Sequence, residues 1–387
     1  NYDLRRTTSV DTAPATLTPM LATLFGGSAQ NNTQRGLFAQ GEFKFNDALT
    51  GVLGARYTKD EKDIIVCGAA ATACGPRYQF NRGEWSDTTP RVGLNWRFDD
   101  NRFFYAYWAK GFRAGGFNGE AGTASAAGPF NPEEVKTIEI GAKLDLLDRR
   151  LRLNAAIFDT DAKDMQRQLA RATSAGVAEI VTQNAAAASY RGAELELTWL
   201  ATDDFRLEAT LGYLDAKYTN YCTDLNGVAP NDPSLVNCAP PITTTTGVIQ
   251  PVDLRRLPIA RAPDLTARVA ALYSVQVNDR GAVSLWLEWS HQGEQLTLDS
   301  GAPQGTTLGI TNFDGSRIEP MRSATNVLNA SVSWEPASER YRVSIYGKNL
   351  TDEIWFRRLS FASPLLSFGT LADPREYGIA FQYHFGK

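Results

Sequence analysis

Hydrophobic and polar residues alternate with a period of two along most of the chain. In the stretch REYGIAFQYHF (375–385), Tyr377, Ile379 and Phe381 fall on one face, with small or polar residues between them. A period of two indicates a β-strand, because successive side chains point to opposite faces. Thirteen such segments predict thirteen strands: 32–45, 48–60, 86–98, 101–117, 132–147, 150–168, 178–199, 204–220, 262–277, 282–298, 322–335, 340–358 and 375–385.

The connections between these predicted strands are of two kinds, and the two kinds alternate. Tight turns rich in Asn, Asp, Gly or Pro are expected near 46–47, 99–100, 148–149, 201–203, 278–281 and 336–339. The remaining connections are long: 61–85, 118–131, 169–177, 221–261, 299–321 and 359–374. Short turns at one end and long loops at the other are typical of outer-membrane β-barrels, whereas a soluble β-sandwich has no reason to sort its loops.

The two faces of the predicted strands differ in charge. In RVGLNWRF, Val92, Leu94 and Trp96 share one face, and Arg91 and Arg97 lie on the other. The same division recurs in RGAELELTW (191–199), AVSLWLEW (282–289) and RYRVSIYGK (340–348). A water-filled lumen accepts charged side chains, but the dry core of a sandwich does not. The fold class predicted is therefore an all-β, antiparallel transmembrane β-barrel.

Aromatic residues collect close to the short turns and the C-terminus. Amphipathic rings gather at membrane–water boundaries, so an aromatic girdle is expected on the short-turn side. The alternative is a set of core aromatics at strand ends. The residues concerned are Phe43, Trp96, Phe103, Trp199, Phe205, Trp334, Tyr341 and Phe385.

Composition narrows the possible functions without naming one. The chain has 387 residues, a net charge of −4 with balanced signs, and 43% hydrophobic residues. The balance of charges gives no footprint for nucleic acid. No apolar run is long enough for a transmembrane helix, but the signal of a transmembrane strand is much weaker. The two histidines, His291 and His384, lie toward opposite ends of their predicted strands, so a catalytic triad or two-histidine metal site is not expected.

Four cysteines form two local pairs, Cys67 with Cys74 and Cys222 with Cys238. Both pairs lie in polar segments of long loops, and neither has the CxxC spacing of a zinc or redox site. Two loop disulfides in an oxidising compartment are expected in preference to free thiols. Each would contribute about 3 kcal/mol.

Several stretches resemble the TonB-dependent receptors, the plugged barrels of Gram-negative outer membranes. The resemblance covers most of the chain from about residue 90 onward, and the combination is more specific than any one motif. The segments are FFYAYWAKGFRAGGFN (103–118), the stretch from 130 to 166, QNAAAASYRGAELELTW (183–199), YGKNLTDE (346–353) and YGIAFQYHF (377–385).

The resemblance implies energised import of a scarce small molecule, most often a ferric siderophore, and no cofactor. The partners would be outer-membrane lipid and TonB of the TonB-ExbB-ExbD complex, acting through a plug domain. Family barrels have about 22 strands, so residues 32–385 are expected to form the C-terminal part of a barrel that is open or incompletely closed. Residues 1–31 would be the remainder of an extracellular loop. A passive porin or structural barrel is the alternative.

Candidate ligand contacts are the residues expected to face the lumen near the long loops. Basic and aromatic groups there would hold an anionic metal chelate through charge-assisted hydrogen bonds and stacking. A solvated pore wall is the competing interpretation. Strand parity places Trp108, Lys110 and Phe112 inward, with Arg113 above them and Gln166 and Arg167 on another strand.

The glycine-rich stretch GFRAGGFNG (111–119) is expected to be a flexible strand top. It lacks the spacing and the Lys-Ser/Thr pair of a phosphate-binding loop. Its glycines permit bends in a tilted strand.

Overall fold

The computed structural model describes residues 2–6, 27–67, 78–119, 127–172, 178–224, 238, 242–244, 247–249, 251–297, 310–311, 317–318, 321–363 and 366–385. All thirteen predicted strands are present in one antiparallel sheet. They are β2 (Gly27–Lys44), β3 (Leu49–Cys67), β4 (Tyr78–Asp99), β5 (Arg102–Arg113), β6 (Glu133–Leu146), β7 (Leu151–Ala172), β8 (Ala178–Leu200), β9 (Phe205–Asp224), β13 (Leu265–Gln276), β14 (Ala282–Gln292), β19 (Thr325–Glu335), β20 (Tyr341–Lys348) and β23 (Glu376–Tyr383).

Two short strands enlarge this sheet to 15 strands: β1 (Tyr2–Arg6) pairs with β2, and β12 (Pro251–Asp253) pairs with β9. Two-stranded sheets lie beside it: β10 (Ile242–Thr244) with β11 (Gly247–Ile249), β15 (Gln295–Leu296) with β18 (Met321–Arg322), β16 (Ile310–Thr311) with β17 (Arg317–Ile318), and β21 (Phe356–Ser363) with β22 (Leu366–Leu371). A single 3₁₀ turn, η2 (Asn278–Arg280), lies between β13 and β14. Among the described residues, no helix is long and apolar enough to cross a membrane.

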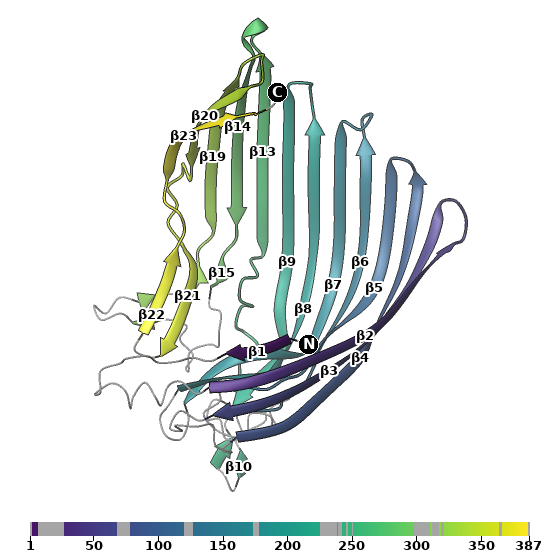
Figure 1. Ribbon diagram of the computed structural model, residues 1–387, viewed down its shortest axis with the longest axis vertical. Helices are drawn as coiled ribbons and strands as arrows, with labels where there is room; N and C mark the ends of the chain where they lie inside the picture. The colour runs from purple at the N-terminus through teal and green to yellow at the C-terminus, as the bar shows by residue number, and fades with distance from the viewer. Residues whose placement is uncertain are drawn as a thin grey trace.

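The large sheet is curved and open. Its strands follow chain order from β1 to β23, and within the described residues no pairing joins β23 to β1 or β2. Figure 1 shows the tight turns together at the upper end of the sheet, whereas the labelled strands β10, β15, β21 and β22, which belong to longer connections, lie toward the lower end. The sorting of loops and the incomplete closure expected from the sequence are both confirmed.

Several strands differ in length from the prediction. β3 continues to Cys67 and β4 begins at Tyr78, because cross-strand pairing extends beyond the predicted ends into the expected loop. The predicted strand 340–358 is wrong in its second half, since β20 ends at Lys348. Asn349 has a positive φ of 48°, and its side chain accepts from Glu353 N (2.9 Å) and donates to Glu353 O (2.8 Å). These bonds close a turn where a continuing strand was expected.

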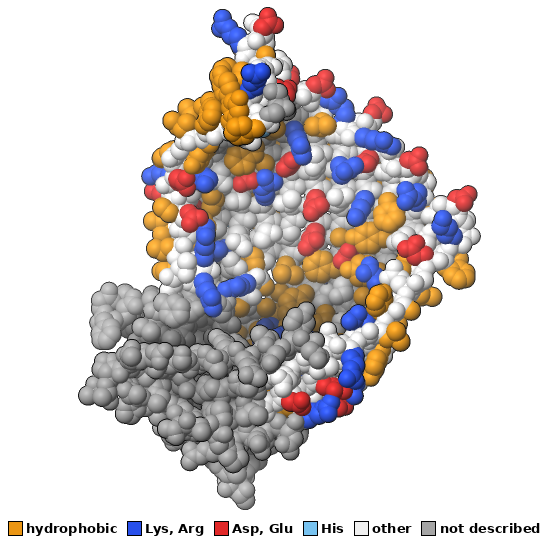
Figure 2. All heavy atoms as spheres, viewed as in Figure 1, with side chains coloured by type: hydrophobic (Ala, Val, Ile, Leu, Met, Phe, Trp, Pro, Cys, Tyr) orange, Lys and Arg blue, Asp and Glu red, His pale blue; other side chains and the backbone are white. Residues whose placement is uncertain are grey.

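The outward face of the sheet carries an apolar band. Leu285 lies opposite Val332, Val332 opposite Ile345, and Ile345 opposite Ile379, so one row crosses four strands. Ile345 is 63% exposed and Ile379 is 75% exposed, which water alone would penalise but lipid would not. Figure 2 shows charged side chains scattered over the hollow inner face, and hydrophobic side chains along its margins and in patches within the hollow. Within this apolar band, the predicted division between the two faces is confirmed.

Charge is nevertheless not confined to the inner face near the long loops. Asp159 lies opposite the exposed Ile138 in register, and Arg191 Nε donates to its carboxylate at 3.0 Å. On the next strand Asp215, opposite Arg191, accepts from Lys217 at 2.9 Å. This outward row of ion pairs follows the apolar band toward the long loops, where a lipid-facing surface gives way to polar surroundings.

The structure places the predicted girdle aromatics on the outward face near the short turns, except for Phe103. Trp96 packs against Phe104, with ring centroids 5.3 Å apart, and the two residues are register partners. Phe103 instead lies opposite Arg97 and stacks on Tyr105, whose hydroxyl donates to Glu139. Phe103 therefore belongs to the inner face, and Phe104 takes the predicted place.

The far end of β9 is tied to neighbouring segments. Cys222 forms the predicted disulfide with Cys238, with Cα atoms 5.5 Å apart; the other expected pair includes Cys74, which lies outside the described residues. Cys222 is also the register partner of Asp253 in β12. The Arg255 guanidinium, which donates to Asp253 at 2.6 Å, lowers the pKa of that carboxyl to about 2.

Candidate functional site

A cleft of about 510 Å³ lies on the inner face near the long-loop end of β2, β3, β4 and β5. Three of its lining residues are basic, one is acidic and two are aromatic. The lining consists of Gln34, Arg56, Thr58, Asp60, Lys62, Thr89, Gly111, Phe112, Arg113, Ala114, Phe130 and Gln166.

Strand alternation explains why β3 supplies so much of this lining. Arg56, Thr58, Asp60 and Lys62 are spaced two residues apart and therefore share one face, opposite the exposed Tyr57. Arg56 Nε donates to Thr58 Oγ1 at 3.1 Å, which orients the guanidinium. The guanidinium carbon of Arg56 lies 6.0 Å from the ring centroid of its register partner, Phe38.

The charges of the cleft do not cancel. Asp60, the only acidic lining residue, accepts from Gln34 Nε2 at 3.2 Å and is largely buried. Lys62 Nζ donates to Gly115 O at 2.5 Å and lies 5.5 Å from the Trp85 ring. The Arg113 side chain is 69% exposed. Among the lining residues, three cations face one carboxylate beside the Phe130 ring, and Arg113 also lies 3.9 Å from Glu133. This arrangement suits an anionic ligand with flat or apolar parts.

Three of the six predicted contact residues meet in this cleft. Phe112 and Arg113 end β5, beyond the last recorded pairing with β4 at Ala109. Gln166 reaches the cleft from β7, where its Nε2 donates to Ala114 O (2.9 Å) and Asn131 O (3.0 Å). Gln166 thus holds neighbouring backbone in place, a role that the sequence did not indicate.

Two other predicted contacts lie elsewhere. Lys110 does not line the cleft, and its ammonium forms ion pairs with Asp87 (2.9 Å) and Glu134 (2.8 Å). Arg167 lies with its guanidinium carbon 5.4 Å from the Tyr218 ring, beside a separate buried cluster of β7, β8 and β9.

The inward placement of Trp108 is wrong. Its register partners are Val92 and Ile138, both exposed members of the outward apolar set. The neighbouring odd-numbered residues face inward instead: Tyr105 and Tyr107 both donate to Glu139, at 2.7 and 2.8 Å. A one-residue slip in assigning parity moves every side chain of a strand to the other face.

Sequence reasoning missed the contribution of β3 and of Phe130. The predicted strand ended at residue 60, so Lys62 was assigned to a loop. In the run from Thr58 to Lys62 every residue is polar, so hydrophobicity no longer alternates and the continuing strand is not visible in the sequence. The charged residues of this run are the only indication of a polar site there. Phe130 comes close to the cleft only through tertiary structure, which no local pattern predicts.

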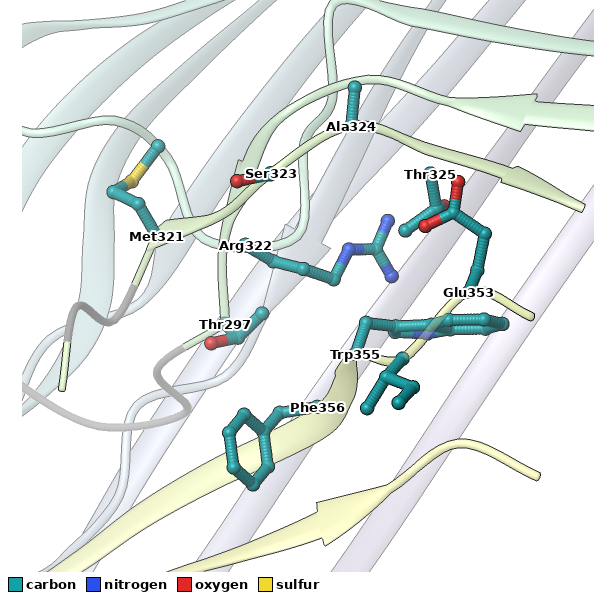
Figure 3. Close-up of a pocket in the computed structure, with 10 residues that line it drawn as sticks. Thr297, Met321, Arg322, Ser323, Ala324, Thr325, Glu353, Trp355 and Phe356 are labelled. Atoms are coloured by element: carbon teal, nitrogen blue, oxygen red, sulfur yellow. The ribbon is translucent and has the colours of Figure 1, made fainter. Parts of the chain in front are cut away.

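A second, smaller cavity of about 200 Å³ lies where β18, β19 and β21 meet. Figure 3 shows the Arg322 side chain extending across it toward Glu353 and Trp355. When the Gln295 amide oxygen faces Arg322, it accepts from both terminal nitrogens, at 3.1 and 2.6 Å. Burial lowers the pKa of the Arg322 guanidinium. Its positive charge is opposed by Glu353 in the same lining, so this cavity is less suited to an anion than the cleft.

The described part of the chain contains no group of three His, Cys, Asp or Glu side chains arranged to hold a metal ion.

Comparison with known proteins places these features in context. The family model described as TonB dependent receptor-like, beta-barrel, matches residues 1–350. The metal-pseudopaline receptor CntO of Pseudomonas aeruginosa is 29% identical over 207 residues, which is 50% of this chain and 26% of the relative. The probable TonB-dependent siderophore receptor PiuA of Acinetobacter baumannii is 28% identical over 252 residues, 61% of this chain and 30% of the relative.

Solved structures share the fold at lower identity. The ferric yersiniabactin uptake receptor FyuA from Yersinia pestis superposes with a TM-score of 0.62 at 19% identity, covering 92% of this chain and 46% of that one. The pyoverdine receptor FpvA from Pseudomonas aeruginosa, bound to pyoverdine, superposes with a TM-score of 0.58 at 15% identity, covering 92% of this chain and 43% of that one. The chain spans less than half the length of these structures and about a third or less of the curated relatives.

Proposed function

Because the chain belongs to the TonB-dependent receptor family, we propose that it is part of an outer-membrane receptor that imports an anionic metal chelate. A ferric siderophore is the ligand that fits best. TonB of the inner-membrane complex would supply the energy through a plug domain of the full-length protein. The long-loop end of the sheet would face the cell exterior, and residues 1–31 would belong to an extracellular loop.

The observation that carries this proposal is the cleft with its excess positive charge. Siderophore complexes of Fe³⁺ are often anionic, and guanidinium and ammonium groups bind such oxygens by charge-assisted hydrogen bonds. Arg56, Lys62 and Arg113 line the cleft together with Phe130 of the opposite segment. The names of two relatives, a metal-pseudopaline receptor and a probable siderophore receptor, point to the same ligand class.

A passive porin is the alternative, and energy dependence separates it from a receptor. We expect the full-length protein, expressed in a siderophore-deficient Gram-negative host, to accumulate ⁵⁵Fe from at least one chelate of a panel of catecholate, hydroxamate and carboxylate types. Deletion of tonB should reduce that uptake to background. Uptake that persists without TonB, or that proceeds equally for neutral solutes of similar size, would favour the porin.

A further inference from the structure

The connection between β5 and β6 folds against the inner face of the sheet. Its described segments, 114–119 and 127–132, form what we call the inner hairpin. Gly116 and Phe130 exchange backbone hydrogen bonds of 3.1 and 2.9 Å, and Asn118 N donates to Ala127 O at 2.8 Å. Ala114 and Phe130 both line the cleft, so the inner hairpin forms one of its sides.

One end of the inner hairpin is fastened to β8 by a carboxamide. Asn118 Nδ2 donates to Thr182 O at 3.0 Å, and Thr182 N donates to Asn118 Oδ1 at 2.8 Å. The Asn118 side chain thus satisfies both backbone groups of Thr182 in the way that a neighbouring strand would. Asn118 is buried, so loss of this pair would leave polar groups unsatisfied.

A second fastening uses Asn184 of β8. Its Oδ1 accepts from Asn131 N at 2.6 Å, and its Nδ2 donates to Asn131 O at 2.8 Å and to Asp164 O at 2.7 Å. Gln166 adds bonds to Ala114 O and Asn131 O, so both legs of the inner hairpin are held from β7 and β8.

The opposite side of the inner hairpin is held by β3 and β4. Phe117 is buried against Trp85, with ring centroids 5.6 Å apart, and against Ile64. Gly115 allows this approach, because a Cβ there would lie 2.3 Å from Trp85 Nε1. Residues 114–119 of the glycine-rich stretch, expected to be a flexible strand top, lie beyond the end of β5 and are packed on both sides.

We propose that the inner hairpin is a fixed wall of the cleft, positioned by the carboxamides of Asn118, Gln166 and Asn184. A movable lid would have to break contacts with β3, β4, β7 and β8 together, whereas a fixed wall keeps Phe130 at a constant distance from Arg56 and Arg113. The wall then limits the shape of the ligands that the cleft accepts. This second part rests on the proposed function; the first part does not.

Hydrogen–deuterium exchange of the full-length receptor in nanodiscs tests the wall directly. The amides of Gly116, Asn118 and Phe130 should exchange as slowly as those of the neighbouring strand β6. Asn184→Ala should accelerate their exchange by about tenfold or more, since a buried hydrogen-bonding group is removed. Asn154→Ala is the matched control, because Asn154 also lies on the inner face of the sheet but donates to Glu196 and not to the inner hairpin.

Fast exchange of these three amides in the wild type, or unchanged exchange in Asn184→Ala, would overturn the proposal. Asn184→Asp separates packing from hydrogen bonding, because it keeps the oxygen that accepts from Asn131 N but removes both donors. Its exchange should fall between wild type and Asn184→Ala. Retention of heat-modifiable migration on gels would show that each variant still forms a barrel.

Transport kinetics test the second part. For an ⁵⁵Fe-chelate that the wild type imports, Asn184→Ala should raise the half-saturating concentration about fivefold or more and leave the maximal TonB-dependent rate unchanged. An unchanged half-saturating concentration, with exchange accelerated, would show that the wall does not affect ligand selection. If the wild type imports no chelate, the proposed function fails, while the exchange experiment still decides the position of the wall.

Discussion

Replacing Arg56 by glutamate in the full-length receptor is expected to weaken binding of its anionic ligand by about 30- to 1,000-fold. The substitution removes a cation from the cleft and introduces repulsion, and such changes cost about 2–4 kcal/mol when the charge faces a bound partner. Arg113→Glu should have a smaller effect, since the Arg113 side chain is mostly exposed. Equilibrium binding of the ferric chelate to purified receptor measures both.

Arg35→Glu is the matched control for the cleft. Arg35 is a cation on β2, next in sequence to the cleft residue Gln34. Its side chain is 73% exposed, and it does not line the cleft. The Arg35→Glu substitution should leave the Kd for the ferric chelate within about twofold of the wild-type value. Equal losses from Arg35→Glu and Arg56→Glu would mean that general surface charge, not the cleft, governs binding.

Introducing arginine into the outward apolar band should destabilise the barrel by about 2–4 kcal/mol. Leu195→Arg and Val343→Arg place a guanidinium where Leu195 faces Leu211 and Val343 faces Phe381. Glu196→Arg is the internal comparison, because Glu196 lies on the inner face and accepts from Asn154 at 3.2 Å. Its effect on folding should be much milder.

Urea unfolding of the refolded full-length barrel in phospholipid vesicles gives these free energies. Similar losses for Leu195→Arg, Val343→Arg and Glu196→Arg would contradict the assignment of inner and outer faces. The comparison is informative because Leu195 and Glu196 are neighbours on β8 at nearly the same depth, and both pair with β7 and β9. They differ in the face of the sheet that they occupy.

The general fold was predictable because a membrane imposes its pattern on every strand. Outward positions must be apolar at the depth of the lipid, and inward positions are free to carry charge, so alternation persists over many residues. The row from Leu285 to Ile379 shows this constraint acting across four consecutive strands of the sheet. The same constraint ends at the membrane boundary, which explains why the long-loop ends of β3 and β4 were missed.

The wrong facing of Trp108 comes from the strand β5. β5 reads FFYAYW, with aromatic residues on both faces, so neither parity is favoured by hydrophobicity. A register shift between Arg97 and Asp99 precedes it in the pairing with β4. An outward Phe103 implies an inward Trp108, because the two residues are five positions apart and alternate faces. Only the cross-strand partners of Trp108 reveal the correct face.

The remaining parts of the site depend on contacts between distant segments. Asn118 and Asn184 are 66 positions apart in the sequence, yet the side chains of both fasten the inner hairpin to β8. Asn349 shows the same limit on a smaller scale, since its bonds to Glu353 determine that the chain turns after β20. Polar side chains that bind backbone leave no periodic signal, and their roles become visible only in three dimensions.

The most direct test of the receptor hypothesis is a cryo-EM structure of the full-length protein with a ferric chelate that it imports. We expect ligand density between Arg56 and Arg113, in contact with Phe130 on the inner hairpin. Density confined to the smaller cavity beside Arg322 and Trp355, with the cleft empty, would contradict the assignment of the binding site.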